Sequence, residues 1–225
     1  MKCNYCKGEC IKFGLYRNGD QRFRCKQCFR NQKESYIYLG CEKGIEKDIE
    51  VLSNESCGIR SISRILAISP GKVLLVIKQL WKEKKLQKRI ILFGRRYELD
   101  EMRTFIGNKQ KKYWIVYAID RATKEVVDFK VGRRNNRTLK RVIDTLLLSK
   151  AKKIYTDGLK NYKRLIPGAI HKVGKNKTNK IERNNLSVRT HLKRLSRKTI
   201  CFSKSISMLE ATLGLYFWKI KSNFI

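Results

Sequence analysis

The stretch RYELDEMRTFIGNKQKKYWIVYAIDRATKEVVDFKVG, residues 96–132, decides the fold of this chain. Three runs within it, at 96–102, 112–120 and 125–132, are rich in β-branched and aromatic residues, and the breaks between them are the short segments GNKQK and RATK. Such runs with short breaks favour antiparallel strands joined by tight turns. The sequence therefore predicts a three-stranded meander here.

The segments after the meander alternate between helix and strand patterns. NNRTLKRVIDTLLLSK carries apolar residues at helical spacing behind a capping asparagine, so it predicts an amphipathic helix. KKIYTDG (152–158) predicts a fourth strand that ends in a turn, and AIHKVG (169–174) predicts a short fifth one. A further helix is expected from about Thr178 to beyond Leu195, and a last one over about 205–220.

A meander followed by alternating helices and strands is the order of a ribonuclease H-like fold. We therefore expect the class α/β (mixed), with a five-stranded sheet and flanking helices in a domain over residues 96–225. In that order, the first and fourth strands lie side by side and parallel.

Four cysteines near the N-terminus have the spacing of a metal site. The motifs CNYC and CKQC place Cys3, Cys6, Cys25 and Cys28 in two CxxC pairs, with the turn RNGD between them. Each pair presents two sulfurs on one tight turn, and two such turns build a tetrahedral Zn²⁺ site with no open position. We predict a zinc ribbon over residues 1–35, stabilised largely by its metal.

Residues 42–86 predict two amphipathic helices joined by a tight turn. In GIRSISRILAISPGKVLLVIKQLWKE, apolar residues recur at i, i+3, i+4 before the turn AISP and at i, i+4, i+7, i+8 after it. Ser69 is a candidate cap, and Pro70 suits the first helical position. The pattern favours a helix-turn-helix DNA-binding domain, whose second helix enters a major groove. A plain helical hairpin has the same pattern.

The charge of the chain favours a polyanionic partner. It has 53 Lys and Arg residues against 19 Asp and Glu, a formal net charge of +34. Such an excess repels itself unless a polyanion neutralises it, and DNA phosphates are the obvious candidate. On charge alone, a nucleic-acid-binding protein without catalytic activity fits as well as an enzyme.

No feature of the sequence indicates a membrane partner. No stretch approaches the ~18 apolar residues that a membrane span requires, and the N-terminal MKCNYC has no hydrophobic signal core. A cytoplasmic location is therefore expected.

Three carboxylates are candidates for a metal site. Asp100 lies inside the first strand of the sheet, where an acid is unfavourable without a partner. Asp157 ends the fourth strand, at the edge where ligands collect in α/β sheets. Glu182 lies in the first turn of a helix that can pack across the same edge. Together they can hold two Mg²⁺ ions, which prefer oxygen ligands and catalyse phosphodiester transfer.

Each acid alone also has an ordinary structural explanation. These are a strand-end ion pair for Asp100, a turn for Asp157 and a favourable helix N-terminal charge for Glu182. Their combination in this order of elements favours a function. Asp120, which ends the second strand, is a weaker candidate for a fourth acid, and His171 is a candidate for a phosphate contact or a structural residue.

The ordered set ELDEM, FIGNK, YWIVYAID, YTDG and IERNN, with the basic stretch up to FSKS, resembles the DDE transposases of the insertion-sequence-one family. The cysteine motifs and IRSISRILAIS resemble the DNA-binding half of that family. The resemblance implies a catalytic triad at Asp100, Asp157 and Glu182. It also implies a phosphate-binding residue at Arg189, two helical turns after the glutamate and on the same face.

The resemblance also implies an activity. Such enzymes bind the terminal inverted repeats of their element, cleave its ends and join the 3′-hydroxyl to target DNA, with Mg²⁺ (or Mn²⁺) in the catalytic site and structural Zn²⁺. Because two ends are joined, we expect a dimer or higher oligomer on double-stranded DNA, associated with a prokaryotic nucleoid. Two alternatives stay open: a sequence-specific regulator with an inactive ribonuclease H-like domain, and another nuclease of that fold, such as a junction resolvase.

Overall fold

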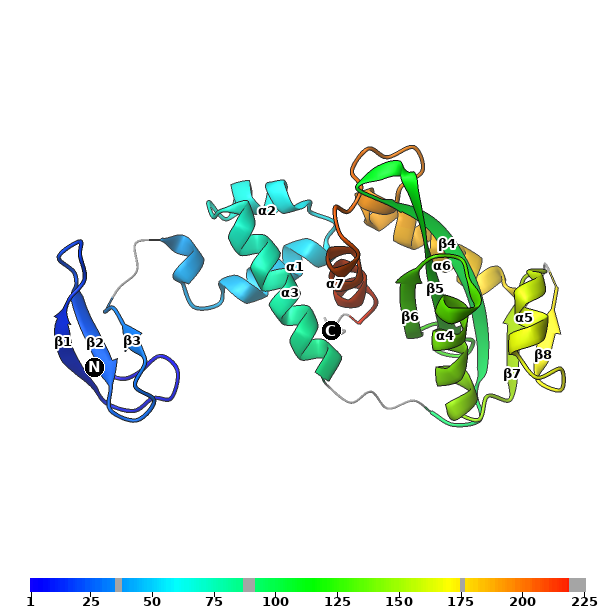
Figure 1. Ribbon diagram of the computed structural model, residues 1–225, viewed down its shortest axis with the longest axis horizontal. Coiled ribbons are helices and arrows are strands. Elements are labelled where there is room, and N and C mark those ends of the chain that lie inside the picture. Colours follow the sequence, from blue (N-terminus) through cyan, green and yellow to red (C-terminus); the bar gives the residue numbers. More distant parts are fainter. Residues whose placement is uncertain (35–37, 87–91, 175–176, 219–225) are drawn as a thin grey trace, which may run out of the picture.

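The computed structural model describes residues 1–34, 38–86, 92–174 and 177–218 (Figure 1). Its N-terminal part is a small antiparallel sheet followed by helices. The strands are β1 (Cys10–Leu15), β2 (Gln21–Cys25) and β3 (Asn31–Gln32). The 3₁₀ helix η1 (Leu39–Cys41) precedes α1 (Ile45–Asn54), α2 (Ile59–Ile65) and α3 (Pro70–Leu86). The predicted pair of helices around residue 69 is therefore present, with a further helix before it.

The second sheet has five strands in the order β6-β5-β4-β7-β8. They are β4 (Arg96–Ile106), β5 (Asn108–Asp120), β6 (Val126–Gly132), β7 (Lys153–Thr156) and β8 (His171–Val173). β5 is antiparallel to both β4 and β6, whereas β7 is parallel to β4 and β8 is parallel to β7. This confirms the predicted mixed sheet of a ribonuclease H-like fold, with its first and fourth strands as parallel neighbours.

Helices cover both faces of this sheet. They are α4 (Asn136–Leu148), α5 (Lys160–Leu165), α6 (Asn179–His191) and α7 (Ile206–Phe217), with the 3₁₀ helix η3 (Lys193–Leu195). Successive strand residues point to opposite faces. Accordingly, Val116 of β5 lies in a core with Leu139 of α4, and its neighbour Tyr117 lies in a second core with Val188 of α6.

Two predicted boundaries are wrong. The segment GNKQK was expected as a break, but β4 and β5 continue through it as a long hairpin that turns at Gly107. A backbone φ of +77° makes glycine the suitable residue for so tight a turn. The helix expected to pass Leu195 ends at His191, and the chain continues as η3.

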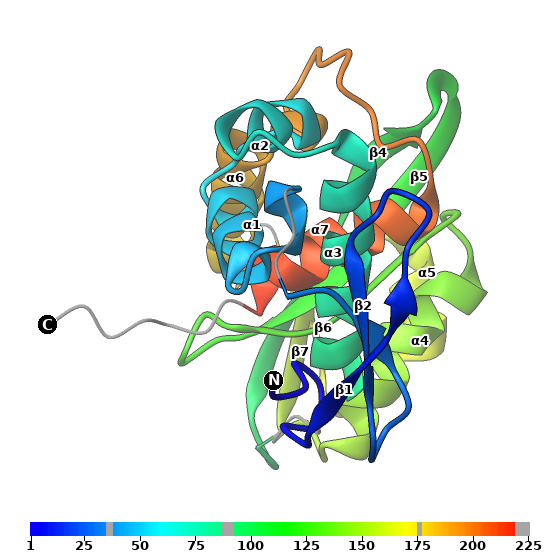
Figure 2. The ribbon, with the colours of Figure 1, turned by 90° about the vertical axis from the view of Figure 1, so that its left-hand side faces the viewer.

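α7 connects the N-terminal helices to the large sheet. Met208 and Leu215 of α7 lie in one core with Ile49 of α1 and Ile77 of α3, and α1, α3 and α7 lie together in both views (Figures 1 and 2). At Gly214 a methyl group would lie 2.0 Å from the Trp81 ring, so only glycine allows this approach of α3. The N-terminal helices therefore share their core with a helix that also packs on the sheet.

Among the described residues, no helix is both long and apolar enough to cross a membrane.

Candidate active site

Three carboxylates meet at the edge of the large sheet. Asp100 and Glu101 lie on β4, and Asp157 directly follows β7. Each offers an oxygen atom within 4.8 Å of the oxygens of the other two. The sheet explains this, because β4 and β7 are parallel and pair Glu98 with Tyr155, two residues before Asp100 and Asp157 respectively. The strand order thus brings together two of the three predicted acids, which are far apart in the sequence.

The pKa of Asp100 is shifted by its surroundings. Its carboxylate accepts hydrogen bonds from the Glu101 backbone N–H at 2.8 Å and from Asn185 Nδ2 of α6 at 2.7 Å. Burial, together with the negative charges of Glu101 and Asp157, nevertheless raises the pKa of Asp100 to about 6. A carboxylate in this position gains from a proton or a cation beside it.

Glu101 was not among the predicted site residues. Its side chain is 2% exposed, and it is paired with Arg134, whose Nη2 lies 2.7 Å from Oε1. The Tyr162 hydroxyl donates to its other oxygen. The sequence carried one signal for it, the adjacent acids in LDEM, but its partners come from segments more than thirty residues away.

Glu182 lies outside the group of three acids. It is in the first turn of α6, where its Oε1 accepts a hydrogen bond from Thr178 Oγ1 at 2.9 Å. It lines a cavity of about 440 Å³ together with Glu101, Asn185 and Arg189. Glu182 therefore lies on the wall of the cavity that Glu101 also lines, and on one side of α6 with Arg189.

Arg189 connects this cavity to a strongly basic one. Its Nη1 donates to the Leu195 carbonyl at 3.0 Å, and burial and the nearby Arg197 lower its pKa. A second cavity, also about 440 Å³, shares Arg189 and Arg197 with the first. Its other cationic lining residues are Arg103, Lys109, Arg194 and Lys198. Negative charge on one side and a field of cations on the other suit a phosphate bound between them.

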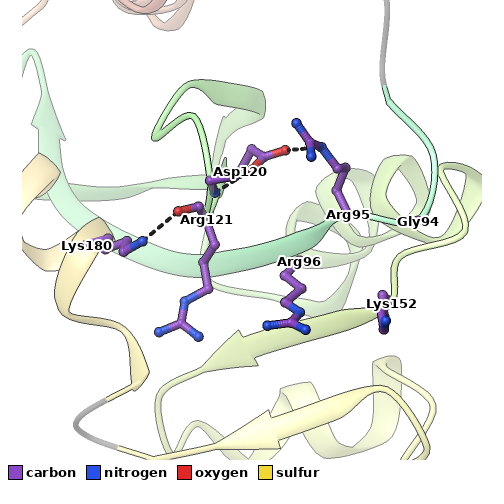
Figure 3. Close-up of a pocket in the computed structure, with 8 residues that line it drawn as sticks. Gly94, Arg95, Arg96, Asp120, Arg121, Lys152 and Lys180 are labelled. Atoms are coloured by element: carbon purple, nitrogen blue, oxygen red, sulfur yellow. Dashed lines mark hydrogen bonds and ion pairs between the residues drawn. The ribbon is translucent and has the colours of Figure 1, made fainter.

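Asp120 is not part of the group of three acids, and His171 lies on the strand beside β7. Asp120 pairs with Tyr97 across the sheet, whereas Asp100 pairs with Tyr117, and its carboxylate contacts Arg95 at 3.1 Å (Figure 3). The expectation of a fourth metal-binding acid is therefore wrong. His171 Nε2 lies 2.8 Å from Oγ1 of Thr156, the residue before Asp157, so its role in a phosphate contact stays a prediction.

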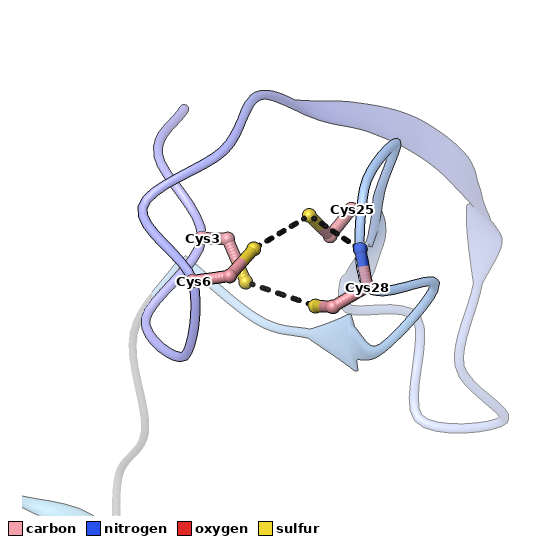
Figure 4. A group of neighbouring side chains, drawn as sticks. All are labelled: Cys3, Cys6, Cys25 and Cys28. Carbon is pink, nitrogen blue, oxygen red and sulfur yellow. Dashed lines mark hydrogen bonds between the residues drawn. The ribbon is translucent and has the colours of Figure 1, made fainter.

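The four predicted zinc ligands converge at the N-terminal end of the molecule (Figure 4). Cys3 and Cys28 have their sulfurs 3.6 Å apart, and Cys6 and Cys25 have theirs 3.4 Å apart. A disulfide needs about 2.05 Å, whereas a tetrahedron of 2.3 Å zinc–sulfur bonds has edges of about 3.8 Å. The sulfurs therefore have the spacing of a metal site.

Backbone N–H groups prepare two of these thiols for a metal. The N–H of Cys28, followed by that of Gln27, lowers the pKa of Cys25 to about 6 despite some opposing effect of burial. The pKa of Cys3 is also lowered, chiefly by the backbone N–H of Cys6. Thiolates are the form that binds zinc.

Comparisons with known proteins place this architecture in a family. Residues 90–223 match the family model described as IS1 transposase. The chain is 38% identical over 122 residues to insertion element iso-IS1n protein InsB of Shigella dysenteriae, covering 54% of this chain and 93% of that protein. It is 38% identical over 119 residues to insertion element IS1 2 protein InsB of Escherichia coli K12, covering 53% of this chain and 71% of that protein.

Two solved structures share parts of the arrangement at low sequence identity. One is a chain of the simian T-cell lymphotropic virus intasome, with a TM-score of 0.39, 14% identity, and coverage of 73% of this chain and 66% of that one. The other is the HTLV-2 integrase catalytic core domain in complex with magnesium, with a TM-score of 0.36, 15% identity, and coverage of 57% and 86%. The family assignment depends on the sequence matches: the family model spans more than half of the chain, which therefore belongs to the IS1 transposase family.

Proposed function

We propose that this chain is a transposase that cleaves the ends of its element and joins the freed 3′-hydroxyl to target DNA. The observation that carries the proposal is the group of Asp100, Glu101 and Asp157 within 4.8 Å, beside a cavity lined by Glu182 and Arg189. Acids at one edge of a ribonuclease H-like sheet, next to a field of cations, suit phosphodiester chemistry on DNA.

The donor set fits a hard divalent cation. Carboxylate oxygens are the ligands that Mg²⁺ and Mn²⁺ prefer, and burial together with the neighbouring acids raises the pKa of Asp100, which a bound cation would counteract. Asp100 and Asp157 would hold the metal, with Glu182 as a further ligand from the cavity wall. When bound, such ions activate the attacking oxygen and stabilise the leaving oxygen of a phosphodiester.

Residues of the chain orient this site and its substrate. Asn185 fixes the Asp100 carboxylate, and the Tyr117 hydroxyl in turn donates to Asn185 Oδ1 at 2.7 Å, so the amide has one orientation. Arg189 and Arg197 line both cavities and would hold the scissile phosphate. The remaining cations of the basic cavity would neutralise flanking phosphates.

We further propose that the N-terminal half recognises the terminal inverted repeats. The domains would be a zinc ribbon at 1–35, a helix-turn-helix at 42–86 and the catalytic domain at 96–225. The side of α3 that carries Lys78, Lys82 and Lys85 is exposed and basic, as a helix in a major groove requires. Joining two ends calls for a dimer or higher oligomer on the nucleoid DNA.

The test is strand transfer with Asp157→Asn, using the repeats that flank the gene and Mg²⁺. The substitution should lower nicking and joining more than about a thousandfold, because the metal supplies several kcal/mol of transition-state stabilisation, and should leave DNA binding unchanged. Asp144→Asn, on α4, is the matched control and should retain activity. Joining by Asp157→Asn at the parent rate would refute the site. Cutting by the parent without joining would favour the nuclease, and binding without cutting the regulator.

A further inference from the structure

A second basic hollow lies where the parallel strands β4 and β7 begin (Figure 3), whereas Asp157 follows the end of β7. It has a volume of about 600 Å³ and is formed where β4 and β7 begin and β5 ends. We call it the rear hollow. Its lining residues are Gly94, Arg95, Arg96, Asp120, Arg121, Ala122, Lys152 and Lys180.

The acids at the rear hollow are already compensated. Asp120 has a 9% exposed side chain that contacts Arg95 Nε at 3.1 Å and accepts a hydrogen bond from the Ala122 N–H at 2.7 Å. Glu98, beneath it, is fully buried and lies 2.7 Å from Arg121 Nε. Each acid therefore neutralises one arginine within the protein.

Three cations of the rear hollow are not neutralised by an acid in the described part of the chain. Arg96, Lys152 and Lys180 form no ion pair with an acid among the described residues. Lys180 Nζ donates only to the Arg121 carbonyl, at 2.7 Å, which ties α6 to the end of β5. Clustered cations without acids repel one another, and a bound anion would remove that cost.

The shape of this charge suits a chain of phosphates. The side chains of Arg96 and Lys152, unpaired with any described acid, end in a row with the guanidinium of Arg121, which is itself paired with Glu98 (Figure 3). The Arg121 guanidinium is held 4.2 Å above the centre of the Tyr155 ring, which restricts its orientation. Guanidinium groups bind phosphate oxygens in pairs. Among the described residues that line the hollow none is aromatic, so these residues offer no ring on which a free nucleotide could stack its base.

The rear hollow is separate from the proposed active site but close to it. Lys180 and Glu182 are two residues apart on α6, about 200° around the helix, so they face different sides. Arg96 precedes Asp100 by four residues on β4, about 13 Å at a strand rise of ~3.3 Å per residue. A duplex that reaches the acids can therefore extend to the rear hollow.

We propose that the rear hollow binds the phosphate backbone of duplex DNA as a second contact, beyond the segment that reacts at the acids. This inference rests on the proposed function for the identity of the polyanion. It assigns Arg96, Lys152 and Lys180 to DNA positioning, without a role in the chemistry.

The experiment measures duplex binding by the full chain at several salt concentrations, without divalent metal and in the Asp157→Asn background, so that cleavage plays no part. Arg96→Gln with Lys152→Gln is the test variant, because neither side chain has an acidic partner to lose. The magnitude of the slope of log affinity against log salt should fall by about 2, since each lost phosphate contact is worth about 0.9. Arg137→Gln with Lys140→Gln, two exposed cations of α4, is the control for charge alone.

An equal slope for test variant, control and parent would overturn the proposal. So would a test variant that loses affinity for inorganic phosphate or a nucleotide while its duplex slope is unchanged. An unchanged melting temperature shows that the variant is folded. The result is independent of the proposed chemistry, because a failure of strand transfer by the parent leaves the slope measurement intact.

Discussion

The thiol cluster and the acid cluster are both groups of metal-ligating side chains, yet they are built in opposite ways. The four sulfurs come from two CxxC turns whose outermost cysteines, Cys3 and Cys28, are 25 residues apart, and they lie on a sheet with a very small core. The acids come from two neighbouring strands of a large sheet with cores on both faces. Four thiolates close a metal's coordination shell, whereas the acids stand beside a cavity. A closed coordination shell suits a structural ion, whereas a catalytic metal needs an open position for its substrate.

The two clusters also differ in how their surroundings shift the pKa values of their side chains. Backbone N–H groups lower the pKa of Cys25, so its thiolate is favoured before any metal arrives, whereas at Cys28 the lowering by the Arg30 N–H is outweighed by burial and the neighbouring thiols, which raise its pKa. Burial and neighbouring acids raise the pKa of Asp100, so its charged form is disfavoured until a cation arrives. A zinc ion would thus complete a fold, and a magnesium ion would relieve an electrostatic cost at a site that exists without it.

The largest expected effect is loss of the N-terminal fold when the thiol cluster loses its metal. Cys25→Ser, or removal of the metal by a chelator, should unfold residues 1–34, because structural zinc contributes on the order of 10 kcal/mol to such small domains. Limited proteolysis with mass spectrometry should show cuts confined to this region, with the large sheet intact. Cys41→Ser, at an exposed cysteine, is the control. Retention of zinc and protease resistance by Cys25→Ser would contradict a structural metal site.

A pair of substitutions separates structure from metal binding within the acid cluster. Glu101→Gln should lower the free energy of unfolding by about 1–3 kcal/mol, because it leaves Arg134 without its carboxylate. Asp157→Asn should change stability little, since its Oδ1 can still accept the hydrogen bond from the Leu159 N–H, but it should remove the rise in melting temperature that Mg²⁺ causes. Thermal denaturation with and without Mg²⁺ measures both. If both variants had the same stability and the same response to Mg²⁺, Glu101 would not have a structural role distinct from metal binding by Asp157.

Protons should compete with the metal at Asp100. Because its pKa is about 6, apparent Mg²⁺ affinity should fall up to about tenfold per unit as pH drops below 6 and should be nearly constant above it. Without metal, the stability of the fold depends on pH in the opposite direction to the metal affinity. The folded-state pKa exceeds the usual 3.8, so this group's contribution to stability is full below about pH 4 and is lost as pH rises through about 6. Calorimetric titrations between pH 5 and 8 test the first statement. An affinity that does not vary with pH would count against Asp100 as a ligand.

The smallest effect is expected at Asn185, which donates a hydrogen bond to Asp100 but is not itself a candidate metal ligand. Asn185→Ala removes the hydrogen bond to Asp100 and should weaken Mg²⁺ binding by about tenfold, as losses of such supporting contacts do. Affinity for DNA should be unchanged. Ser187→Ala, on the same helix, is the control, since its hydroxyl donates to the Arg183 carbonyl of its own helix and to no acid among the described residues. A loss of DNA affinity equal to the loss of metal affinity would show that Asn185 acts on the substrate instead.

The contrast between the clusters also explains what the sequence could reveal. The cysteine set is predictable because its geometry is local and its spacing is explicit. Asp100 and Asp157 are predictable one step later, because the order of strands brings β4 and β7 together. Glu101 was missed because its partners, Arg134 and Tyr162, depend on how distant helices and loops pack on the sheet.

Other errors have the same physical origin. Asp120 was expected near the metals because it ends a strand, but β5 is antiparallel to β4 and carries it to the other end of the sheet. Pairing across the hairpin extends β4 and β5 through a segment whose residues individually favour a break. The rear hollow had no sequence signal, because its cations come from β4, α6 and the loops before β4, after β5 and before β7.

The most direct test of the central claim is the anomalous scattering of crystals of the full chain grown with Mn²⁺. We expect an anomalous peak in contact with the carboxylates of Asp100 and Asp157, and no such peak in Asp157→Asn. A manganese signal elsewhere, with none at these two residues in the parent protein, would contradict a catalytic metal site at the edge of this sheet.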